Sequence, residues 1–177
     1  LINDCDAVIS CLGHNISFKG LFGKPRQLVS DSIKNICKAI EKNKKDKVKL
    51  ILMNTTANMN RKLQENYSSK DRLVLSLLQL FPPPHKDNVE AASYLSNVIG
   101  ENNSTIEWIA VRPDTLINEE KVSEYEIVES IKRSPVFDPG KTSRINLAHF
   151  IVELLLNEKL WNTWKFRMPV IYNRESK

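Results

Sequence analysis

Apolar positions along the chain follow two patterns, short continuous runs and helical spacing. Residues 6–13 (Asp-Ala-Val-Ile-Ser-Cys-Leu-Gly) form one run, 48–53 a second, and 106–111 a third that Arg112-Pro113 stops. Uninterrupted runs of this length are typical of strands buried on both faces of a parallel sheet. A shorter strand is expected at 127–128. A final strand is predicted in 166–172, at a sheet edge because it contains Pro169.

Helical spacing fills the segments between these runs. From Pro25 to Ile40 the apolar side chains recur every three or four residues, which predicts an amphipathic helix with Pro25 in its first turn. A helix capped by Ser69 or Asp71 should end at Pro82-Pro83-Pro84, because each proline ring removes a donor. Two further helices are predicted, over 88–98 and over 147–157, the second with Asn146 as N-cap.

The order of these elements predicts an α/β fold. Strands that alternate with helices form a parallel sheet with helices on both faces. At ~150 residues per domain, a chain of 177 residues is expected to form a single domain. The predicted architecture is a partial Rossmann-like, doubly wound parallel sheet.

The composition excludes several classes of protein. Hydrophobic residues make up 41% of the chain and charged residues 27%, which excludes disorder, and no apolar run approaches the ~18 residues of a membrane helix. An odd number of cysteines argues against a disulfide framework and for a reducing, cytoplasmic compartment. Cys5, Cys11 and Cys37 are expected to be small buried thiols, with no metal site.

The net charge of +5 is not expected to indicate nucleic-acid binding. The lysines gather in residues 42–49, after an amphipathic segment, where they suit a solvated helix end. A nucleic-acid surface would need arginine and interleaved aromatic side chains, which this run lacks. The partners expected are a dinucleotide and a small-molecule substrate, and either a protein partner or a second copy of the chain.

Polar groups follow each of the three long runs. They are residues 10–14 (Ser-Cys-Leu-Gly-His), 54–56 (Asn-Thr-Thr) and 112–115 (Arg-Pro-Asp-Thr). Ligands of open parallel sheets bind beyond the carboxyl ends of the strands, so these groups are predicted to converge on one site. Gly13 would allow a ligand to approach the backbone closely.

The same segments carry a family resemblance. Residues 6–13, the apolar strand that ends in Thr55-Thr56, the sequence Trp-Ile-Ala-Val-Arg-Pro (108–113) and residues 143–150 resemble, in order and spacing, the atypical short-chain dehydrogenase/reductases. These are NAD(P)-binding Rossmann proteins that include NmrA-like regulators and flavin/biliverdin reductase B. The likeness spans most of the chain.

The resemblance implies roles for individual residues. Those expected at the NAD or NADP cofactor are Cys11, Leu12, Gly13, His14, Asn54, Thr55, Arg112, Pro113, Asp114 and Thr115. Thr56 resembles the catalytic Ser/Thr of the family. Asn146 stands where the family often has an aspartate, and we interpret it as structural.

The chain departs from the family in two respects. None of its five glycines forms the glycine-rich phosphate loop, so we expect it to be the C-terminal portion of such a domain, which binds cofactor only when that loop is supplied. It also lacks the Tyr-x-x-x-Lys pair, because Lys70 follows Tyr67 by three residues and Val98 occupies the lysine position after Tyr94. His85 could replace the tyrosine as an acid oriented by Asp87; alternatively, Asp87 or Asn88 caps the next helix.

Three functions therefore remain open. The first is an NAD(P)H-dependent reductase, or an epimerase-like enzyme, that acts on a small planar or carbonyl substrate. The second is a non-catalytic dinucleotide-sensing regulator, and the third a fragment that is inactive without the phosphate loop. Residues 58–81 form a long connection, which predicts a lid or a partner surface.

Overall fold

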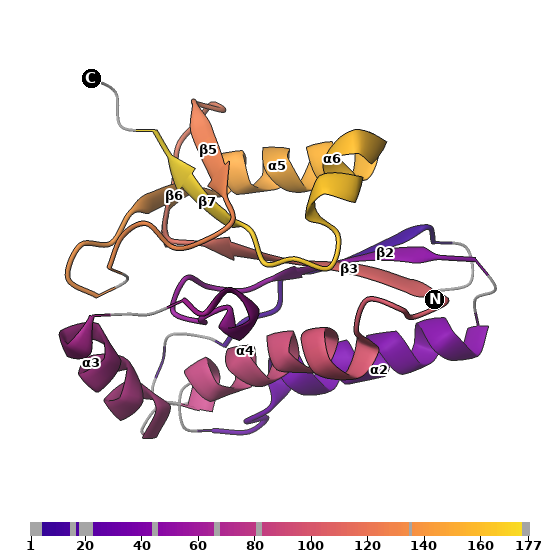
Figure 1. The fold of residues 1–177 in the computed structure, drawn as a ribbon, viewed down its shortest axis with the longest axis horizontal. Helices are drawn as coiled ribbons and strands as arrows, with labels where there is room; N and C mark the ends of the chain where they lie inside the picture. Colours follow the sequence, from indigo (N-terminus) through magenta and orange to yellow (C-terminus); the bar gives the residue numbers. More distant parts are fainter. Residues whose placement is uncertain are drawn as a thin grey trace.

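The computed structural model describes residues 5–14, 17, 23–43, 46–65, 68–80, 83–134 and 136–174. One twisted sheet lies between two helical layers, with α2 (Leu28–Asn43) and α4 (Pro83–Tyr94) on one face and α5 (Arg144–Leu156) and α6 (Glu158–Trp164) on the other (Figure 1). This arrangement confirms the predicted α/β class.

The sheet has five strands in the order β1-β2-β3-β7-β5. They are β1 (Ala7–Ser10), β2 (Val48–Met53), β3 (Ile106–Pro113), β7 (Val170–Asn173) and β5 (Tyr125–Val128). The first four run parallel, and β5 is antiparallel to β7. The prediction that the last strand lies at an edge is wrong, because Pro169 precedes β7 and its carbonyl accepts a hydrogen bond from the Arg112 amide at 2.8 Å.

The proline triplet both ends one helix and begins another. α3 (Ser69–Leu80) stops before it, as predicted, but α4 begins at Pro83 rather than near residue 88. A helix tolerates proline in its first turn, where the missing N–H has no intrahelical acceptor. α4 continues as a π-helical turn, η2 (Leu95–Ile99). α2 begins at Leu28, three residues after Pro25.

The N-cap of α5 is Ser143, not Asn146. The Ser143 hydroxyl accepts a hydrogen bond from the Asn146 amide at 3.2 Å. The Asn146 side chain instead donates to Ser123 Oγ at 2.9 Å and to Asn173 Oδ1 at 2.8 Å, and therefore joins α5 to the end of β7. Its predicted structural role is confirmed, although by a different contact.

Several short elements were not predicted. They are the 3₁₀ turn η1 (Arg61–Leu63) and the parallel pair β4 (Thr115–Ile117) and β6 (Lys141–Ser143). The pair begins directly after β3, so it extends the end of that strand into a two-stranded ribbon. The seven-residue α6 was also missed.

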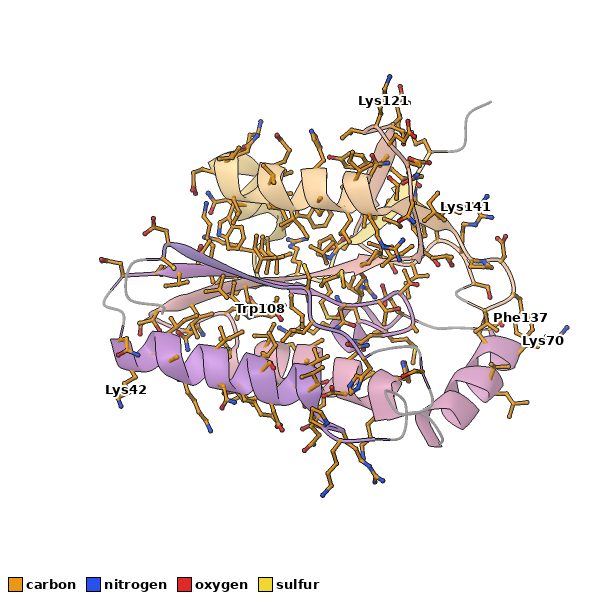
Figure 2. The ribbon with its side chains drawn as sticks, turned by 180° about the vertical axis from the view of Figure 1, so that it is seen from behind. Lys42, Lys70, Trp108, Lys121, Phe137 and Lys141 are labelled. Atoms are coloured by element: carbon orange, nitrogen blue, oxygen red, sulfur yellow. The ribbon has the colours of Figure 1, made fainter. Side chains whose placement is uncertain are left out.

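The two faces of the sheet carry separate cores. Trp108 lies between the sheet and the α2/α4 layer (Figure 2), and Cys37 of α2 packs into the same core. Cys5 and Cys11 are exposed, so the expectation of three buried thiols is correct only for Cys37. The opposite core lies under α5 and α6. None of the helices in the described ranges is long and apolar enough to cross a membrane.

β1 forms one edge of the sheet, and one of its faces is open. Ile9 lies opposite Ile51 in the β1–β2 register. Ile51 is 0% exposed, whereas Ile9 is 44% exposed, as is Leu12 just beyond the strand. The α5 layer therefore covers β2 but leaves the same face of β1 accessible to solvent.

Candidate functional site

The polar groups that follow β1, β2 and β3 lie side by side. Ser10 is opposite Leu52, and Met53 is opposite Val111. Beyond the strands, the Asn54 amide donates to the Val111 carbonyl at 2.7 Å. Residues 11–14 and 54–56 follow β1 and β2, and residues 112–115 span the end of β3, which continues through Arg112-Pro113 rather than stopping before them. All three groups lie along one edge of the sheet, which we call the rim. The three groups share one edge of the sheet, as predicted, and their convergence on one ligand site stays a prediction.

The first turns of α4 join two parts of the rim. The Asn54 side chain donates to the Asn88 carbonyl at 2.9 Å. His14 Nε2 lies 2.7 Å from Asp87 Oδ2, and both side chains are nearly inaccessible to solvent. α4 thereby holds the loop after β1 and the loop after β2 in fixed relation to each other.

Asp87 caps a helix other than its own. Its carboxylate accepts hydrogen bonds from the Val29 amide at 2.8 Å and the Ser30 amide at 2.9 Å, in the first turn of α2. Burial tends to raise the pKa of Asp87, but these donors and His14 outweigh it and hold the pKa below its ordinary value. The alternative that Asp87 or Asn88 caps the next helix is wrong, because both residues lie inside α4; Asp87 caps the earlier helix α2 instead.

His85 lies in the first turn of α4 and is half-buried. Burial lowers its pKa, which favours the neutral imidazole near pH 7. An imidazole does contact the Asp87 carboxylate, and it belongs to His14. The acid role of His85 stays a prediction, and its environment does not favour it.

The loop after β1 is the most accessible part of the rim. Cys11, Leu12 and Gly13 are exposed. A Cβ placed on Gly13 would meet no heavy atom within 4 Å among the described residues. A ligand can therefore approach the backbone here without displacing atoms of the described residues.

At the second strand end, one of the two hydroxyls is accessible. Thr55 is half-buried, and its Oγ1 accepts a hydrogen bond from the Ala57 amide at 3.2 Å. Thr56 is only 2% exposed, and its amide donates to the Pro113 carbonyl at 3.3 Å. This geometry makes Thr55 the better placed hydroxyl, while the catalytic role of Thr56 stays a prediction.

Arg112 is buried and uses all five of its N–H donors within the protein. Nε donates to the Met168 carbonyl at 2.8 Å, and Nη1 to the Asn58 carbonyl at 2.9 Å. Nη1 and Nη2 also bind the two oxygens of Glu65 at 2.7 and 2.8 Å, and Nη2 reaches the Glu129 carbonyl at 3.2 Å. We interpret Arg112 as the residue that shapes this part of the rim rather than one that contacts a ligand.

Glu65 was not identified from the sequence, because it lies in an irregular segment without periodicity. Its carboxylate also accepts hydrogen bonds from the Asn60 amide at 2.6 Å and from Ser130 Oγ at 3.0 Å. Burial tends to raise the pKa of Glu65, but Arg112 and these donors hold it below its ordinary value. The segment after β2 and the segment after β5 are thus fixed to the end of β3.

The remaining rim residues differ in exposure. Pro113 and Asp114 are buried, and Thr115 is exposed. Asp114 Oδ1 accepts a hydrogen bond from the Thr115 amide at 2.7 Å, and the Asp114 amide donates to Thr142 Oγ1 at 3.1 Å. Burial raises the pKa of Asp114 in spite of its amide donors. Thr115 is therefore the member of this group that a ligand can reach.

α3 projects from the main body beside the carboxyl edge of the sheet (Figure 1). Its first turn is anchored through Asp71, which accepts hydrogen bonds from Ser68 Oγ at 2.6 Å and from Ser134 Oγ. The bonds from Ser134 and Ser68 lower the pKa of Asp71. Leu73 on the same helix is 63% exposed. The lid or partner-surface role of this segment stays a prediction, and Tyr67 lies outside the described residues.

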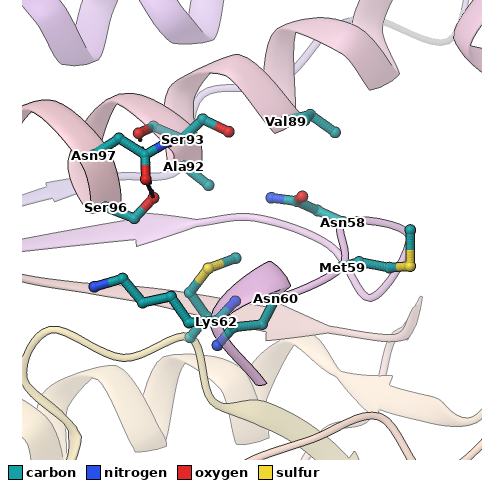
Figure 3. Close-up of a pocket in the computed structure, with 10 residues that line it drawn as sticks. Asn58, Met59, Asn60, Lys62, Val89, Ala92, Ser93, Ser96 and Asn97 are labelled. Atoms are coloured by element: carbon teal, nitrogen blue, oxygen red, sulfur yellow. Dashed lines mark hydrogen bonds between the residues drawn. The ribbon is translucent and has the colours of Figure 1, made fainter. Parts of the chain in front are cut away.

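A small hollow of ~70 Å³ separates the segment after β2 from α4 and η2 (Figure 3). Amide and hydroxyl side chains line it, among them Asn58, Asn60, Ser93 and Asn97. Its volume is a fraction of the ~300–1,000 Å³ of typical ligand sites, so it is too small to hold a dinucleotide.

Comparison with known proteins identifies the family. The sequence profile of an NAD(P)H-binding family matches residues 1–158. The chain belongs to this family. The predicted resemblance to NAD(P)-binding Rossmann proteins is thereby confirmed, and a nicotinamide dinucleotide is the cofactor class of the fold. No curated protein sequence matches the chain.

Solved structures share the fold at low sequence identity. A candidate NADH-flavin reductase from Streptococcus pneumoniae aligns with a TM-score of 0.64 and 15% identity, over 98% of this chain and 74% of that one. A short-chain dehydrogenase/reductase from Veillonella parvula in complex with NADP aligns with a TM-score of 0.59 and 13% identity, over 97% of this chain and 64% of that one. An anaerobillin reductase from Escherichia coli aligns with a TM-score of 0.61 and 14% identity, over 97% of this chain and 65% of that one. This chain thus spans 64–74% of these proteins.

Proposed function

We propose that the rim binds the nicotinamide half of NADH or NADPH, in an oxidoreductase that reduces a small planar or carbonyl substrate. The observation that carries this proposal is the placement of three accessible groups, the 11–13 backbone, Thr55 and Thr115, along one edge of a parallel sheet. When bound, the dinucleotide supplies the hydride.

The residues of the rim fit part of such a cofactor. The open backbone at Gly13 accepts a flat or bulky group, and the hydroxyls of Thr55 and Thr115 suit a ribose or a carboxamide. The pyrophosphate needs a glycine-rich turn at a helix N-terminus, which the sequence does not carry. We propose that such an element adds to the free edge of β1, where Ile9 and Leu12 are exposed.

The test separates binding from folding at Gly13. NADH or NADPH is added to the protein, and the melting temperature and the nicotinamide fluorescence are followed. At ~100 times Kd, a bound dinucleotide should add ~2.7 kcal/mol to the unfolding free energy. Gly13→Val should leave the melting temperature of the free protein unchanged, since its Cβ meets no neighbour, but should weaken binding by about tenfold. Ala148→Val, on the exposed surface of α5, is the control.

If neither dinucleotide shifts the melting temperature, the 177-residue chain by itself does not bind the cofactor. A separately expressed glycine-rich strand–turn–helix segment is then added to the protein, and the titration with NADH or NADPH is repeated. Absence of a shift in that mixture as well would overturn the proposal.

A non-catalytic dinucleotide-binding regulator is the second candidate. The sequence supports it, because Val98 occupies the lysine position after Tyr94 and the Tyr-x-x-x-Lys pair of the catalytic dehydrogenases is missing. A regulator would bind NADPH without oxidising it in the presence of flavin, quinone or carbonyl compounds. A reductase would consume the nicotinamide absorbance.

A further inference from the structure

Aliphatic side chains are exposed on two neighbouring elements, the open face of β1 and the outer side of α5. Ile9 of β1 is 44% exposed, and Val152 and Leu156 of α5 are 49% and 77% exposed. Single exposed aliphatic residues are common on protein surfaces, but a group of them on adjacent elements usually marks a contact with another structure.

The exposed side of α5 turns toward β1. Lys49, on the strand next to β1, donates a hydrogen bond to the Leu155 carbonyl of α5 at 3.3 Å. Val152 precedes Leu155 by three residues and so lies on the same side of the helix. The other side of α5 faces β5, because His149 is hydrogen-bonded to that strand at 2.7 Å. Val152 and Ile9 therefore border one apolar surface, which we call the β1–α5 surface.

The hand of the fold selects a helix for this surface. β1, α2 and β2 form a parallel strand–helix–strand unit, with α2 on the face of the sheet opposite α5. Such units are right-handed in nearly all proteins. A unit that continues the sheet beyond β1, in the opposite direction, must therefore place its helix on the α5 face.

The solved structures described above are long enough to hold such a unit outside the part that this chain matches. The chain covers 74% of the Streptococcus pneumoniae protein and 64% of the Veillonella parvula protein. About a quarter to a third of each therefore lies outside the match, whereas a strand–helix–strand unit needs only ~30 residues. An amphipathic helix, with aliphatic residues along one side, suits the aliphatic β1–α5 surface.

We infer that the helix of the glycine-rich strand–turn–helix segment lies on the β1–α5 surface, with its aliphatic side against Ile9 and Val152. This inference rests on the proposed function, which places that segment at the free edge of β1. It adds the face of the sheet on which the helix lies and the side chains of this chain that contact it. A charge at Val152 should therefore weaken binding of the segment without altering the rim.

The probe is a designed segment, in which a strand of alternating valine and threonine leads into a G-x-G-x-x-G turn and a helix with leucine and alanine along one side. Fluorescence anisotropy of a dye on this helix measures its affinity for the 177-residue chain, without dinucleotide. Val152→Glu should weaken binding by about tenfold or more, because its carboxylate would be buried against an aliphatic helix. Val122→Glu is the matched control, because Val122 is 46% exposed and lies just before β5, at the other edge of the sheet.

Methyl NMR of the chain identifies the face on which the helix lies. The signals of Val152 and Leu156 should shift when the segment binds. The signals of Val29, on α2 and in the core of the opposite face, should stay unchanged. Melting temperatures verify that both glutamate variants are folded.

Loss of affinity confined to Val152→Glu, with shifts at Val152 and Leu156, supports the inference. Equal affinities of the two variants, shifts at Val29 instead, or no binding of the segment to the original chain would overturn it. Self-association of the chain alone that Val152→Glu abolishes would also overturn it, because a second copy would then occupy the surface.

The proposed function fails separately. If the segment binds through Val152 but neither dinucleotide shifts the melting temperature of the mixture, the rim does not bind the cofactor and the position of the helix stands. If NADH or NADPH binds in a manner that depends on Gly13 while Val152→Glu has no effect, only the inference about the helix is overturned.

Discussion

Glu65 holds Arg112 at both ends of its guanidinium, with Nη1–Oε2 and Nη2–Oε1 distances of 2.7 and 2.8 Å. The two side chains are 3% and 0% exposed. The carboxylate also accepts hydrogen bonds from Ser130 Oγ and the Ile131 amide. One ion pair therefore fixes the end of β3 to two segments that are distant in the sequence.

Replacement of Glu65 by glutamine should destabilise the fold strongly. It leaves the buried Arg112 charge without its partner, and removal of one member of a buried pair costs ~3–5 kcal/mol. The control is Glu101→Gln, which breaks the exposed Lys62–Glu101 pair and should cost less than ~1 kcal/mol. Urea unfolding measures both. Equal costs would show that the Glu65 pair contributes little.

Acid should destabilise the protein through the same carboxylate. The pKa of Glu65 is lowered in the folded state, so its contribution is complete above the ordinary value of 4.5 and is lost as the pH falls through the lowered value. The pKa of Asp87 is also lowered from its ordinary value of 3.8, so this carboxylate contributes to stability in the same direction. Unfolding free energies between pH 7 and pH 3 should fall, and the fall should be smaller in Glu65→Gln. Parallel curves would contradict this account.

Asp87→Ala should loosen α2 and the loop after β1 together. The substitution removes the cap from the Val29 and Ser30 amides, a loss of ~1–2 kcal/mol, and frees His14. Hydrogen exchange should accelerate in the first turn of α2. His14→Ala is the matched variant, because it leaves the cap in place; exchange in α2 as fast as in Asp87→Ala would assign the effect to His14 instead.

Replacement by alanine should destabilise the protein at one glycine and have little effect on stability at another. At Gly140 the new Cβ would lie 2.5 Å from the Tyr172 ring, and overpacking of this kind costs ~1–3 kcal/mol. At Gly13 the Cβ meets no atom of the described residues within 4 Å, so the change should stay within ~0.5 kcal/mol. Thermal unfolding of the two variants decides the matter. A stable Gly140→Ala would mean that the ring moves away from the backbone.

Ile9 and Ile51 provide a measure of the open face of β1. They are opposite each other in register, but only Ile51 is fully buried. Ile51→Ala should cost ~2–5 kcal/mol, and Ile9→Ala clearly less. Denaturant unfolding of both variants tests the difference. A similar cost at Ile9 would show that another part of the chain covers this face in solution.

The fold was predictable where hydrophobic periodicity is strong. β2 matches its apolar run residue for residue, and α3 ends before the prolines as expected. The position of β7 in the sheet was not predictable from Pro169, because a proline just before a strand costs no ladder bond. The start of α4 was missed for a related reason, since the same residue type breaks a helix interior and suits its first turn.

The site was predictable at the level of strand ends but not of individual contacts. Parallel topology alone brings Gly13, Thr55 and Thr115 to one edge. Asp87 contacts His14, 73 residues away, and Glu65 contacts Arg112, 47 residues away, and no local pattern indicates either pair. Whether a threonine hydroxyl is accessible, as at Thr55, or buried, as at Thr56, depends on the turn after the strand.

The outer edge of β1 also affects how the protein behaves at high concentration. The strand Ala7–Ser10 carries no charged side chain and no proline, the features that usually prevent strand edges from pairing. No described strand occupies its outer side. Two molecules that meet along this edge can extend one sheet into the other, so association through β1 should grow with protein concentration.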